Sequence, residues 1–323
     1  MKRLLCRLAS PKLTLAGFVL VGIGVMAGAA PAAWPAAPVV LPLALLVLNL
    51  AAALATRERL RHGGLGVFHV ALLALLLLAG WGRLTHFDAR VEIGEGTAFD
   101  AAHVMSARHG PLHPHHLATL QFRQGGIQVD YAPRLRRSHT RSEVLLGDGT
   151  RQVVGDDTPL SLGGYRFYTT PNKGLAVALR WQLRDGEPMA GLLHLPSYPF
   201  YDYLQENTWT APDGRALRFR VQPDRETPVE QAWTLDPRAM QGTLVVEAAD
   251  GRHELRAGQS LALGDATLRY DGIVGWMGYR IFYDPTLLPM LGVALTGVLG
   301  LGWHLWRHWR RPQRDAATDG VPA

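Results

Sequence analysis

Residues 65–81 read LGVFHVALLALLLLAGW, an almost unbroken apolar run with one ionisable side chain, His69. A helix satisfies its own backbone hydrogen bonds, and about 20 apolar residues of helix cross the hydrocarbon core of a membrane. Three further stretches of the 323-residue chain have the same character, namely residues 13–30, 37–55 and 286–306. We therefore predict four transmembrane α-helices, three before and one after a long polar segment.

Basic residues are distributed unevenly around these apolar segments. They precede the first segment, fall between the second and third, and follow the fourth, whereas the link between the first and second has no charge. By the positive-inside rule both termini are cytoplasmic. The predicted domains are a cytoplasmic N-terminus and three transmembrane helices over 1–83, a periplasmic domain over 84–285, a transmembrane helix over 286–306 and a cytoplasmic tail over 307–323.

The first apolar segment also fits a cleaved secretory signal peptide, because a basic start and an apolar run are followed by small residues at 27–33. Cleavage leaves the order of the other segments unchanged, so both interpretations stay open.

Composition and charge exclude several classes of protein. The chain is 48% hydrophobic, which excludes a disordered protein. Its one cysteine, Cys6, excludes a disulfide framework and a CxxC redox centre. The net charge is +6, but residues 84–285 hold 21 basic and 24 acidic residues, a net charge of −3. The positive excess therefore belongs to the helix flanks, which predicts contact with membrane lipid and no nucleic-acid partner.

The polar segment has the pattern of antiparallel strands. Apolar and polar residues alternate over 216–221, 242–248 and 266–270. Asp-Gly pairs, which supply the positive φ of hairpin turns, occur at 148–149, 185–186, 213–214, 250–251 and 271–272. We expect a mostly antiparallel β domain, either a sandwich or a partly open barrel.

Residues 159–168 resemble residues 260–270, since each has alternating leucines, a glycine turn and a closing tyrosine. A duplicated half-domain and two unrelated hairpins with the same turn chemistry both explain this similarity.

Three segments together resemble one protein family. The second apolar segment contains LLVLNL at 45–50, the third opens with VFHVALL at 67–73, and GWMGYRIFYDP at 275–285 runs directly into the fourth. With the order of three helices, a β-rich domain and one helix, the chain resembles the ResB-like (CcsB) family of System II cytochrome c biogenesis. The resemblance implies a multi-pass subunit of the bacterial inner membrane. It also implies that the subunit works with a CcsA-type partner to carry haem b across the membrane for attachment to apocytochrome c.

The resemblance also implies a haem axial ligand in the third transmembrane helix, and the matching position is His69. Physical chemistry agrees, because a polar side chain at that depth costs free energy unless it finds a partner, and imidazole is a common ligand of haem iron. Asn49 in the second helix lies at a similar depth, so we expect its amide to accept a hydrogen bond from the second ring nitrogen. The simpler alternative is that His69 hydrogen-bonds a neighbouring helix and binds nothing.

The densest histidine cluster comprises His109, His113, His115 and His116, with His103 upstream. A transition-metal site and a solvated, pH-sensitive loop are both possible interpretations. The spacing matches no established zinc pattern, and we predict no metal site separate from haem iron.

The sequence contains no nucleophile elbow, P-loop, dinucleotide fingerprint or HExxH motif, and we predict no catalytic residue. Two other functions stay open: a membrane-anchored scaffold that does not bind haem, and an accessory subunit of a transporter or respiratory complex.

Overall fold

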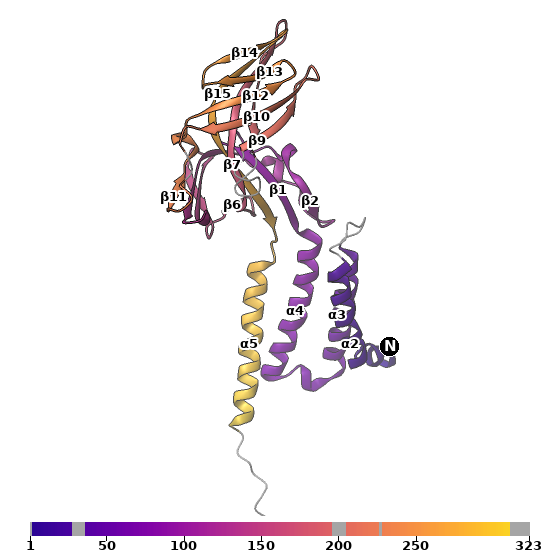
Figure 1. Cartoon of the computed structure of the whole chain (residues 1–323). Helices are drawn as coiled ribbons and strands as arrows, with labels where there is room; N and C mark the ends of the chain where they lie inside the picture. Colours follow the sequence, from indigo (N-terminus) through magenta and orange to yellow (C-terminus); the bar gives the residue numbers. More distant parts are fainter. Residues whose placement is uncertain (1, 28–35, 196–204, 226–227, 311–323) are drawn as a thin grey trace, which may run out of the picture. The chain divides into compact units, whose positions relative to one another are not determined.

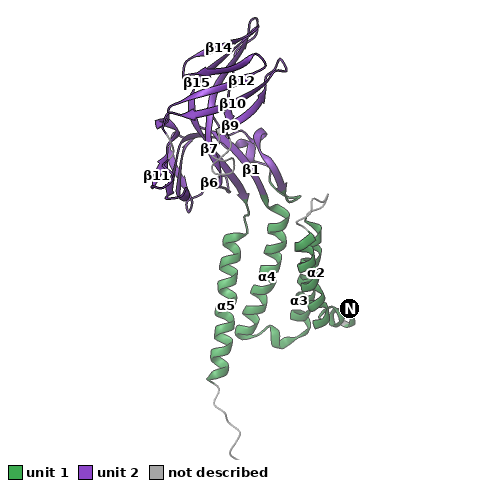
Figure 2. Cartoon of the chain, in the orientation of Figure 1, with its two compact units in different colours: residues 1–87, 109–114, 283–323 green, residues 88–108, 115–282 purple. Residues whose placement is uncertain are grey.

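The computed structural model describes residues 2–27, 36–195, 205–225 and 228–310 of the chain. They divide into two compact units, which Figure 2 colours separately. A helical unit contains residues 1–87, 109–114 and 283–323, and a sheet unit contains residues 88–108 and 115–282.

The helical unit combines apolar helices long enough to cross a membrane with shorter helices. Its helices are α1 (Lys2–Leu8), α2 (Pro11–Ala27), α3 (Ala37–Thr56), α4 (Gly63–Thr85) and α5 (Leu287–Trp309), with a short 3₁₀ turn, η1 (Glu58–Leu60), after α3. Among the described residues, α3, α4 and α5 are long and apolar enough to cross a membrane, and α2 is a shorter apolar helix of 17 residues. The prediction of three apolar helices before the strands and one after them is confirmed.

Small residues allow these helices to pack closely side by side (Figure 1). Gly64 of α4 faces Gly300 of α5, and a Cβ atom added to Gly64 would lie 2.2 Å from the Gly300 carbonyl oxygen. A Cβ atom on Gly17 of α2 would lie 2.5 Å from the side chain of Leu46 in α3. Such glycine contacts are typical of helices that associate in lipid, where van der Waals packing replaces the hydrophobic effect.

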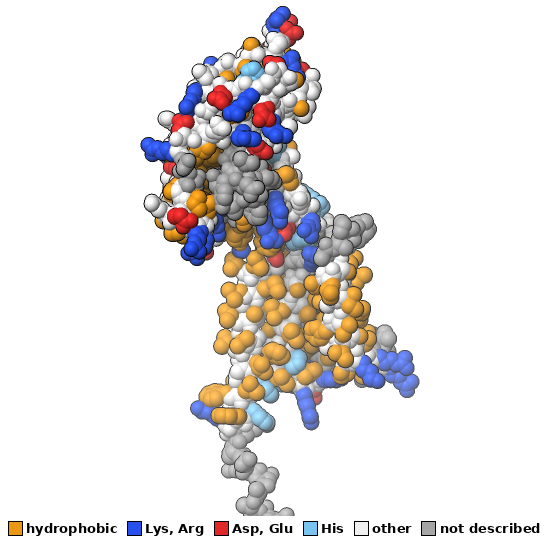
Figure 3. Space-filling view, viewed as in Figure 1, with side chains coloured by type: hydrophobic (Ala, Val, Ile, Leu, Met, Phe, Trp, Pro, Cys, Tyr) orange, Lys and Arg blue, Asp and Glu red, His pale blue; other side chains and the backbone are white. Residues whose placement is uncertain are grey.

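The basic helix flanks gather at one end of the helical unit. The guanidinium of Arg57, which follows α3, donates a 2.9 Å hydrogen bond to the Ala9 carbonyl between α1 and α2. The last turns of α5 lie at the same end, because Gly64 at the start of α4 contacts His304. Figure 3 shows hydrophobic side chains over the visible face of the helices and Lys and Arg side chains gathered at the end where α1 lies.

The strands in the described part of the chain form three sheets. They are β1 (Phe87–Gly94), β2 (Met105–His109), β3 (Phe122–Ala132), β4 (Arg136–Leu146), β5 (Arg151–Gly155), β6 (Leu160–Leu162), β7 (Tyr165–Leu183), β8 (Met189–His194), β9 (Gln205–Thr210), β10 (Ala216–Pro223), β11 (Trp233–Leu235), β12 (Gly242–Ala248), β13 (Gly251–Leu255), β14 (Ser260–Leu263) and β15 (Ala266–Tyr283). The large sheet has the order β2-β1-β15-β7-β6, with β14 paired to β15 and β8 to β7. The other two sheets have the orders β13-β12-β10-β9 and β11-β3-β4-β5. The predicted, mostly antiparallel β domain is confirmed, and its sheets are not closed into a barrel.

A hydrophobic core forms where strands of the large sheet pack against the β13-β12-β10-β9 sheet. Its residues follow the two-residue period of a strand. In β10, Leu217, Phe219 and Val221 are buried while the residues between them are more exposed. Val177 of β7 and Leu268 of β15 belong to the same cluster. The alternation seen in the sequence over 216–221 therefore marks one buried face of a strand.

Four of the five Asp-Gly pairs lie at the turns that we predicted. Three lie between β4 and β5, β7 and β8, and β9 and β10, and in the fourth Asp250 precedes Gly251, the first residue of β13. The fifth prediction is wrong, because Asp271-Gly272 lies inside β15. Gly272 has a φ of +147°, so glycine lets the strand pass through a conformation that other residues rarely adopt.

The two similar segments, 159–168 and 260–270, form the β6-β7 and β14-β15 hairpins. Each hairpin opens one of the two long strands that are neighbours in the large sheet.

Candidate functional site

His69 lies in the second turn of α4 and is half-buried. Its Nδ1 atom is 2.8 Å from the carbonyl oxygen of Leu65, one helical turn earlier. Because a carbonyl only accepts, Nδ1 carries the proton of the neutral ring and Nε2 keeps a lone pair. Within the described part of the chain, Nε2 has no hydrogen-bond partner. The neutral ring therefore offers one lone pair, on Nε2.

His69 lies on a face of α4 that is turned away from α5. Gly64 and Ala71 form the contact with α5, and at 100° per residue His69 is about 140° around the helix from Gly64. A groove of about 590 Å³ between α4 and α5 is lined by other residues of α4, including Gly66 and Val70. The face that carries His69 is thus separate from this groove.

Asn49 is buried in α3 but does not bind His69. Its Oδ1 atom accepts a 2.7 Å hydrogen bond from the Thr14 hydroxyl, and its Nδ2 atom donates to the carbonyls of Leu8 at 2.6 Å and Ser10 at 3.0 Å. These bonds tie α3 to the junction of α1 and α2. The expected hydrogen bond between the two side chains is absent among these described residues, and a backbone carbonyl takes the position that we predicted for the amide.

The histidines between 103 and 116 do not form one site. His113 is buried, stacks on Phe87 with ring centroids 4.8 Å apart, and places Nδ1 3.1 Å from the Thr85 carbonyl. The prediction of a solvated loop is therefore wrong for His113. His116 instead places Nε2 2.7 Å from the Gly163 carbonyl. Among the residues that the structure describes, no three His, Cys, Asp or Glu side chains are grouped as a metal ion requires.

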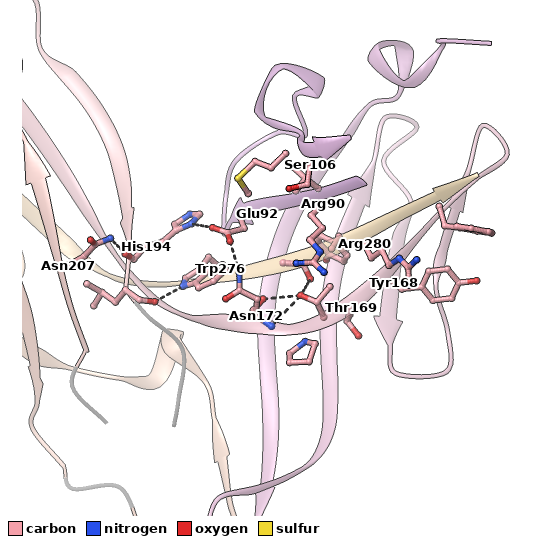
Figure 4. Close-up of a pocket in the computed structure, with 18 residues that line it drawn as sticks. Arg90, Glu92, Ser106, Tyr168, Thr169, Asn172, His194, Asn207, Trp276 and Arg280 are labelled. Atoms are coloured by element: carbon pink, nitrogen blue, oxygen red, sulfur yellow. Dashed lines mark hydrogen bonds and ion pairs between the residues drawn. The ribbon is translucent and has the colours of Figure 1, made fainter. Parts of the chain in front are cut away.

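A cleft of about 1410 Å³ opens on one face of the large sheet (Figure 4). Strands β1, β15 and β7 are neighbours there, and side chains of a strand alternate between its two faces. Glu92, Arg280 and Asn172 line the cleft, one from each strand. Tyr279 of β15 is buried, and its hydroxyl donates a 2.7 Å hydrogen bond to Gln124. The cleft therefore combines polar groups of three neighbouring strands with apolar lining such as Met105 and Phe282.

His194, at the end of β8, is held firmly at the edge of this cleft. Its ring lies parallel to the indole of Trp276, with centroids 4.8 Å apart and an interplanar angle of 3°. Its Nδ1 atom is 3.2 Å from Oε2 of Glu92, and Asn172 donates to the other carboxylate oxygen at 2.5 Å. The His194 hydrogen bond lowers the pKa of the Glu92 carboxyl despite partial burial, which acts in the opposite direction. Glu92 is thus an anion at neutral pH.

No sequence motif marks His194 or Glu92 as site residues. They are 102 positions apart, so no spacing motif links them. The available signal was the segment 275–285, because it contains Trp276 and Arg280 of the cleft.

Comparisons with known proteins identify the family. A model of the ResB-like family matches residues 49–262 of the chain, which include Asn49, His69, Glu92 and His194. The chain belongs to the ResB-like family.

Three curated relatives of this ResB-like chain carry the name cytochrome c biogenesis protein CcsB. The protein of Synechococcus sp. strain JA-3-3Ab is 30% identical over 264 residues, which is 73% of this chain and 51% of the relative. A second Synechococcus protein, from strain JA-2-3B'a(2-13), is 28% identical over 249 residues, which is 72% of this chain and 49% of the relative. The Microcystis aeruginosa protein is 26% identical over 242 residues, which is 71% of this chain and 49% of the relative. The ResB-like chain thus spans about half the length of the curated relatives it matches.

A solved structure named cytochrome c heme lyase CcmF aligns with 90% of this ResB-like chain and 34% of its own chain. The sequence identity is 13% and the TM-score is 0.30, too low to support an inference about the fold.

Proposed function

We propose that this ResB-like chain acts in cytochrome c biogenesis, where it binds haem b within the membrane through His69. Together with a CcsA-type partner, it delivers the haem for attachment to apocytochrome c. The names of its relatives support the pathway. The observation that carries the residue assignment is the contact with the Leu65 carbonyl, which fixes the proton on Nδ1 and leaves the Nε2 lone pair for iron.

The surroundings of His69 fit the role of an axial ligand. Phe68 packs against the imidazole edge-on, with ring centroids 5.3 Å apart, and the hydrogen bond to the carbonyl fixes the ring from behind. Such a partner behind the ring orients histidines that bind metals. His69 lies on a face of α4 turned away from α5. We therefore assign the second axial ligand and most of the haem surface to the partner.

We place the helical unit in the bacterial inner membrane with its basic end in the cytoplasm. The support is the gathering of the basic flanks around Arg57 and Ala9 and near the Gly64–His304 contact at one end of the unit. Since α4 ends and α5 begins at the opposite end, residues 88–282 are then connected to the periplasmic side. Both termini are cytoplasmic, and lipid surrounds the exposed apolar side chains.

The test is the absorption spectrum of the chain purified together with its CcsA-type partner. Replacing His69 by Ala removes the iron ligand, so we expect the haem absorbance of the complex to be lost. The matched control is His308→Ala, because His308 is an exposed histidine at the end of α5. An unchanged spectrum of the His69→Ala complex would return this residue to a packing role and favour a scaffold without haem.

A further inference from the structure

The groove between α4 and α5 has the depth of one membrane leaflet. The two helices lie side by side (Figure 1), and Arg61 and Trp303 line the groove at the basic end of the helical unit. Ala74 and Val293 line its other end. From Gly63 to Ala74 the helix rises about 16 Å, at 1.5 Å per residue. Half of the hydrocarbon core of a bilayer is about 15 Å, so the groove reaches from the basic end to the middle of the membrane.

The wall of the groove is apolar over this depth. Between its two ends the lining consists of glycines, aliphatic side chains and one hydroxyl, that of Thr296. This hydroxyl donates a 2.9 Å hydrogen bond to the Gly292 carbonyl within α5, so it needs no partner from a ligand. A hydrocarbon chain therefore matches the wall, whereas a polar ligand would leave its own hydrogen-bonding groups unsatisfied there.

The groove is too narrow for a helix of another protein. Dividing its volume of about 590 Å³ by its length of about 16 Å gives a mean cross-section of roughly 37 Å². A helix with its side chains is about 10 Å wide, which corresponds to a cross-section of roughly 80 Å². An extended hydrocarbon chain lies within such a groove, and a helix lies only against its rim.

The basic end of the groove attracts an anion. The guanidinium of Arg61 is exposed and makes no hydrogen bond or ion pair with any residue that the structure describes. The guanidinium of Arg307 lies 5.7 Å from the ring centre of Trp303 at the same end. Among the described residues, Glu58 is the one carboxylate at this end of the helical unit, and it lies 3.6 Å from His62. A negatively charged headgroup therefore meets two cationic groups here.

Trp303 stands between the apolar wall and the charged end. Its large side chain is 44% exposed. Tryptophan is enriched at the boundary of membranes, where the ring lies against acyl chains and its N–H donates to polar groups. A ligand whose hydrocarbon chain continues into an anionic headgroup at this level matches both parts of the groove.

We infer that the groove between α4 and α5 binds one anionic phospholipid, with an acyl chain along the groove and the phosphate beside Arg61 and Arg307. The site does not depend on haem, because His69 is not part of the groove lining. A ligand that binds only the folded state stabilises it, so the lipid strengthens the packing of α4 against α5.

The experiment is native mass spectrometry of the full-length chain, released from micelles that contain equal amounts of phosphatidylglycerol and phosphatidylcholine with the same acyl chains. We expect one phosphatidylglycerol to stay bound in preference to phosphatidylcholine. Thr296→Trp fills the groove and should abolish this retention. The matched control is Val298→Trp, which adds the same side chain at an exposed position of α5 outside the groove. Equal retention of the two lipids, or retention that Thr296→Trp does not change, would overturn the inference.

The preference for an anionic lipid is tested at Arg61. One basic side chain near an anionic lipid contributes roughly fivefold in affinity, so Arg61→Gln should weaken the binding of phosphatidylglycerol by about this factor. Arg61→Lys keeps the charge and should retain most of the affinity. Arg59→Gln is the matched control, because Arg59 is an exposed arginine that does not line the groove. An equal loss with Arg59→Gln would indicate a general attraction of the basic flank and would overturn the site.

Two further measurements locate the lipid and identify what is recognised. Phosphatidylglycerol with a photoreactive group at the end of one acyl chain should label α4 and α5 near Ala74 and Val293. Labelling of α2 or α3 alone would place the lipid elsewhere and overturn the inference. Inorganic phosphate should not displace the lipid, because the acyl chain supplies most of the contact. Displacement by phosphate would indicate a site for a free anion and would also overturn the inference.

The main alternative is that a helix of the membrane partner covers the groove. Thr296→Trp would then prevent copurification with the CcsA-type partner while the isolated chain keeps its phosphatidylglycerol, and this result would overturn the lipid site. The inference and the proposed function fail independently. His69→Ala should leave lipid retention unchanged, so the haem spectrum tests the proposed function alone and the retained lipid tests the groove alone.

Discussion

The side-chain oxygen of Asn49 in α3 accepts a 2.7 Å hydrogen bond from the hydroxyl of Thr14 in α2, 35 positions earlier in the chain. Together with the bonds from its amide nitrogen to the carbonyls of Leu8 and Ser10, this contact makes Asn49 the polar link between α3 and the junction of α1 and α2. The residue fixes how the first helices pack, and it leaves the orientation of His69 to a backbone carbonyl.

Replacing Asn49 by Leu should therefore destabilise the helical unit without changing haem binding. The change removes the amide donor of the part-buried Leu8 carbonyl and the acceptor of the Thr14 hydroxyl, at a cost of about 1–3 kcal/mol. We expect a lower thermal unfolding temperature in detergent and an unchanged haem spectrum. Leu48→Ala, at an exposed neighbouring position, is the control and should have little effect. A loss of haem at full stability would contradict this assignment.

The close contact between α4 and α5 predicts that the stability of the helical unit depends strongly on the size of the residue at position 64. A Cβ atom there would lie 2.2 Å from the Gly300 carbonyl oxygen, so Gly64→Val must push the helices apart at a cost of about 1–3 kcal/mol. Gly302→Val is the matched control, since a Cβ atom at Gly302 meets nothing within 4 Å. Thermal unfolding of the two variants in the same detergent should differ clearly, and equal stability would show that this contact does not set the helix packing.

The buried Lys173 in β7 should make the stability of the folded chain rise with pH. Its side chain is buried, and burial lowers the pKa of the ammonium from its ordinary 10.5 to about 8, with the charge of Arg137 acting in the same direction and that of Asp156 opposing it. Between these two values the folded chain binds fewer protons than the unfolded chain. The free energy of unfolding should therefore increase as pH rises from about 8 to about 10.5.

The Lys173→Met variant should lose this pH dependence and should be more stable than the parent chain at pH 7. Arg166→Met, a change to a less buried basic residue of the same strand, should keep it. Chemical denaturation across this pH range is the measurement. A parent chain whose stability falls over the same interval would contradict the sign that we derive.

The ion pair between Asp88 and Arg280 predicts an effect at acidic pH. The hydrogen bond from Arg280 lowers the pKa of the Asp88 carboxyl below its ordinary 3.8, so the pair stabilises the fold above that value. This contribution is lost as pH falls through the lowered pKa. Because both side chains are partly exposed, Arg280→Ala should cost only about 0.2–1 kcal/mol at neutral pH.

The difference between Arg280→Ala and the parent chain should shrink as pH falls through the lowered pKa of Asp88, because protonation of the carboxyl removes the charge of the pair. Arg184→Ala breaks a more exposed ion pair, with Asp265, and serves as the control, with a smaller effect expected at neutral pH. A difference for Arg280→Ala that does not change as the solution is acidified below pH 3.8 would indicate lost packing rather than lost charge.

The sequence by itself determined the helices, their order and the strands with clean alternation. These features depend on local chemistry, because an apolar run of sufficient length satisfies its own backbone hydrogen bonds in lipid and a two-residue period buries one face of a strand. His69 was recognisable for the same reason, as an ionisable residue within an apolar run. The turn predicted at Asp271-Gly272 was wrong, since Gly272 supplies a positive φ inside β15 rather than in a turn.

Only the tertiary structure decided which polar groups meet. The side-chain conformation of His69 places its Nδ1 atom at the Leu65 carbonyl. The side chain of Asn49 instead forms hydrogen bonds with Thr14 of α2 and with the carbonyl of Ser10, just before α2. Glu92 and His194 were brought together across 102 positions of sequence by the order of strands in the large sheet. Long-range pairing of this kind depends on register and topology, which side-chain composition along one strand does not encode.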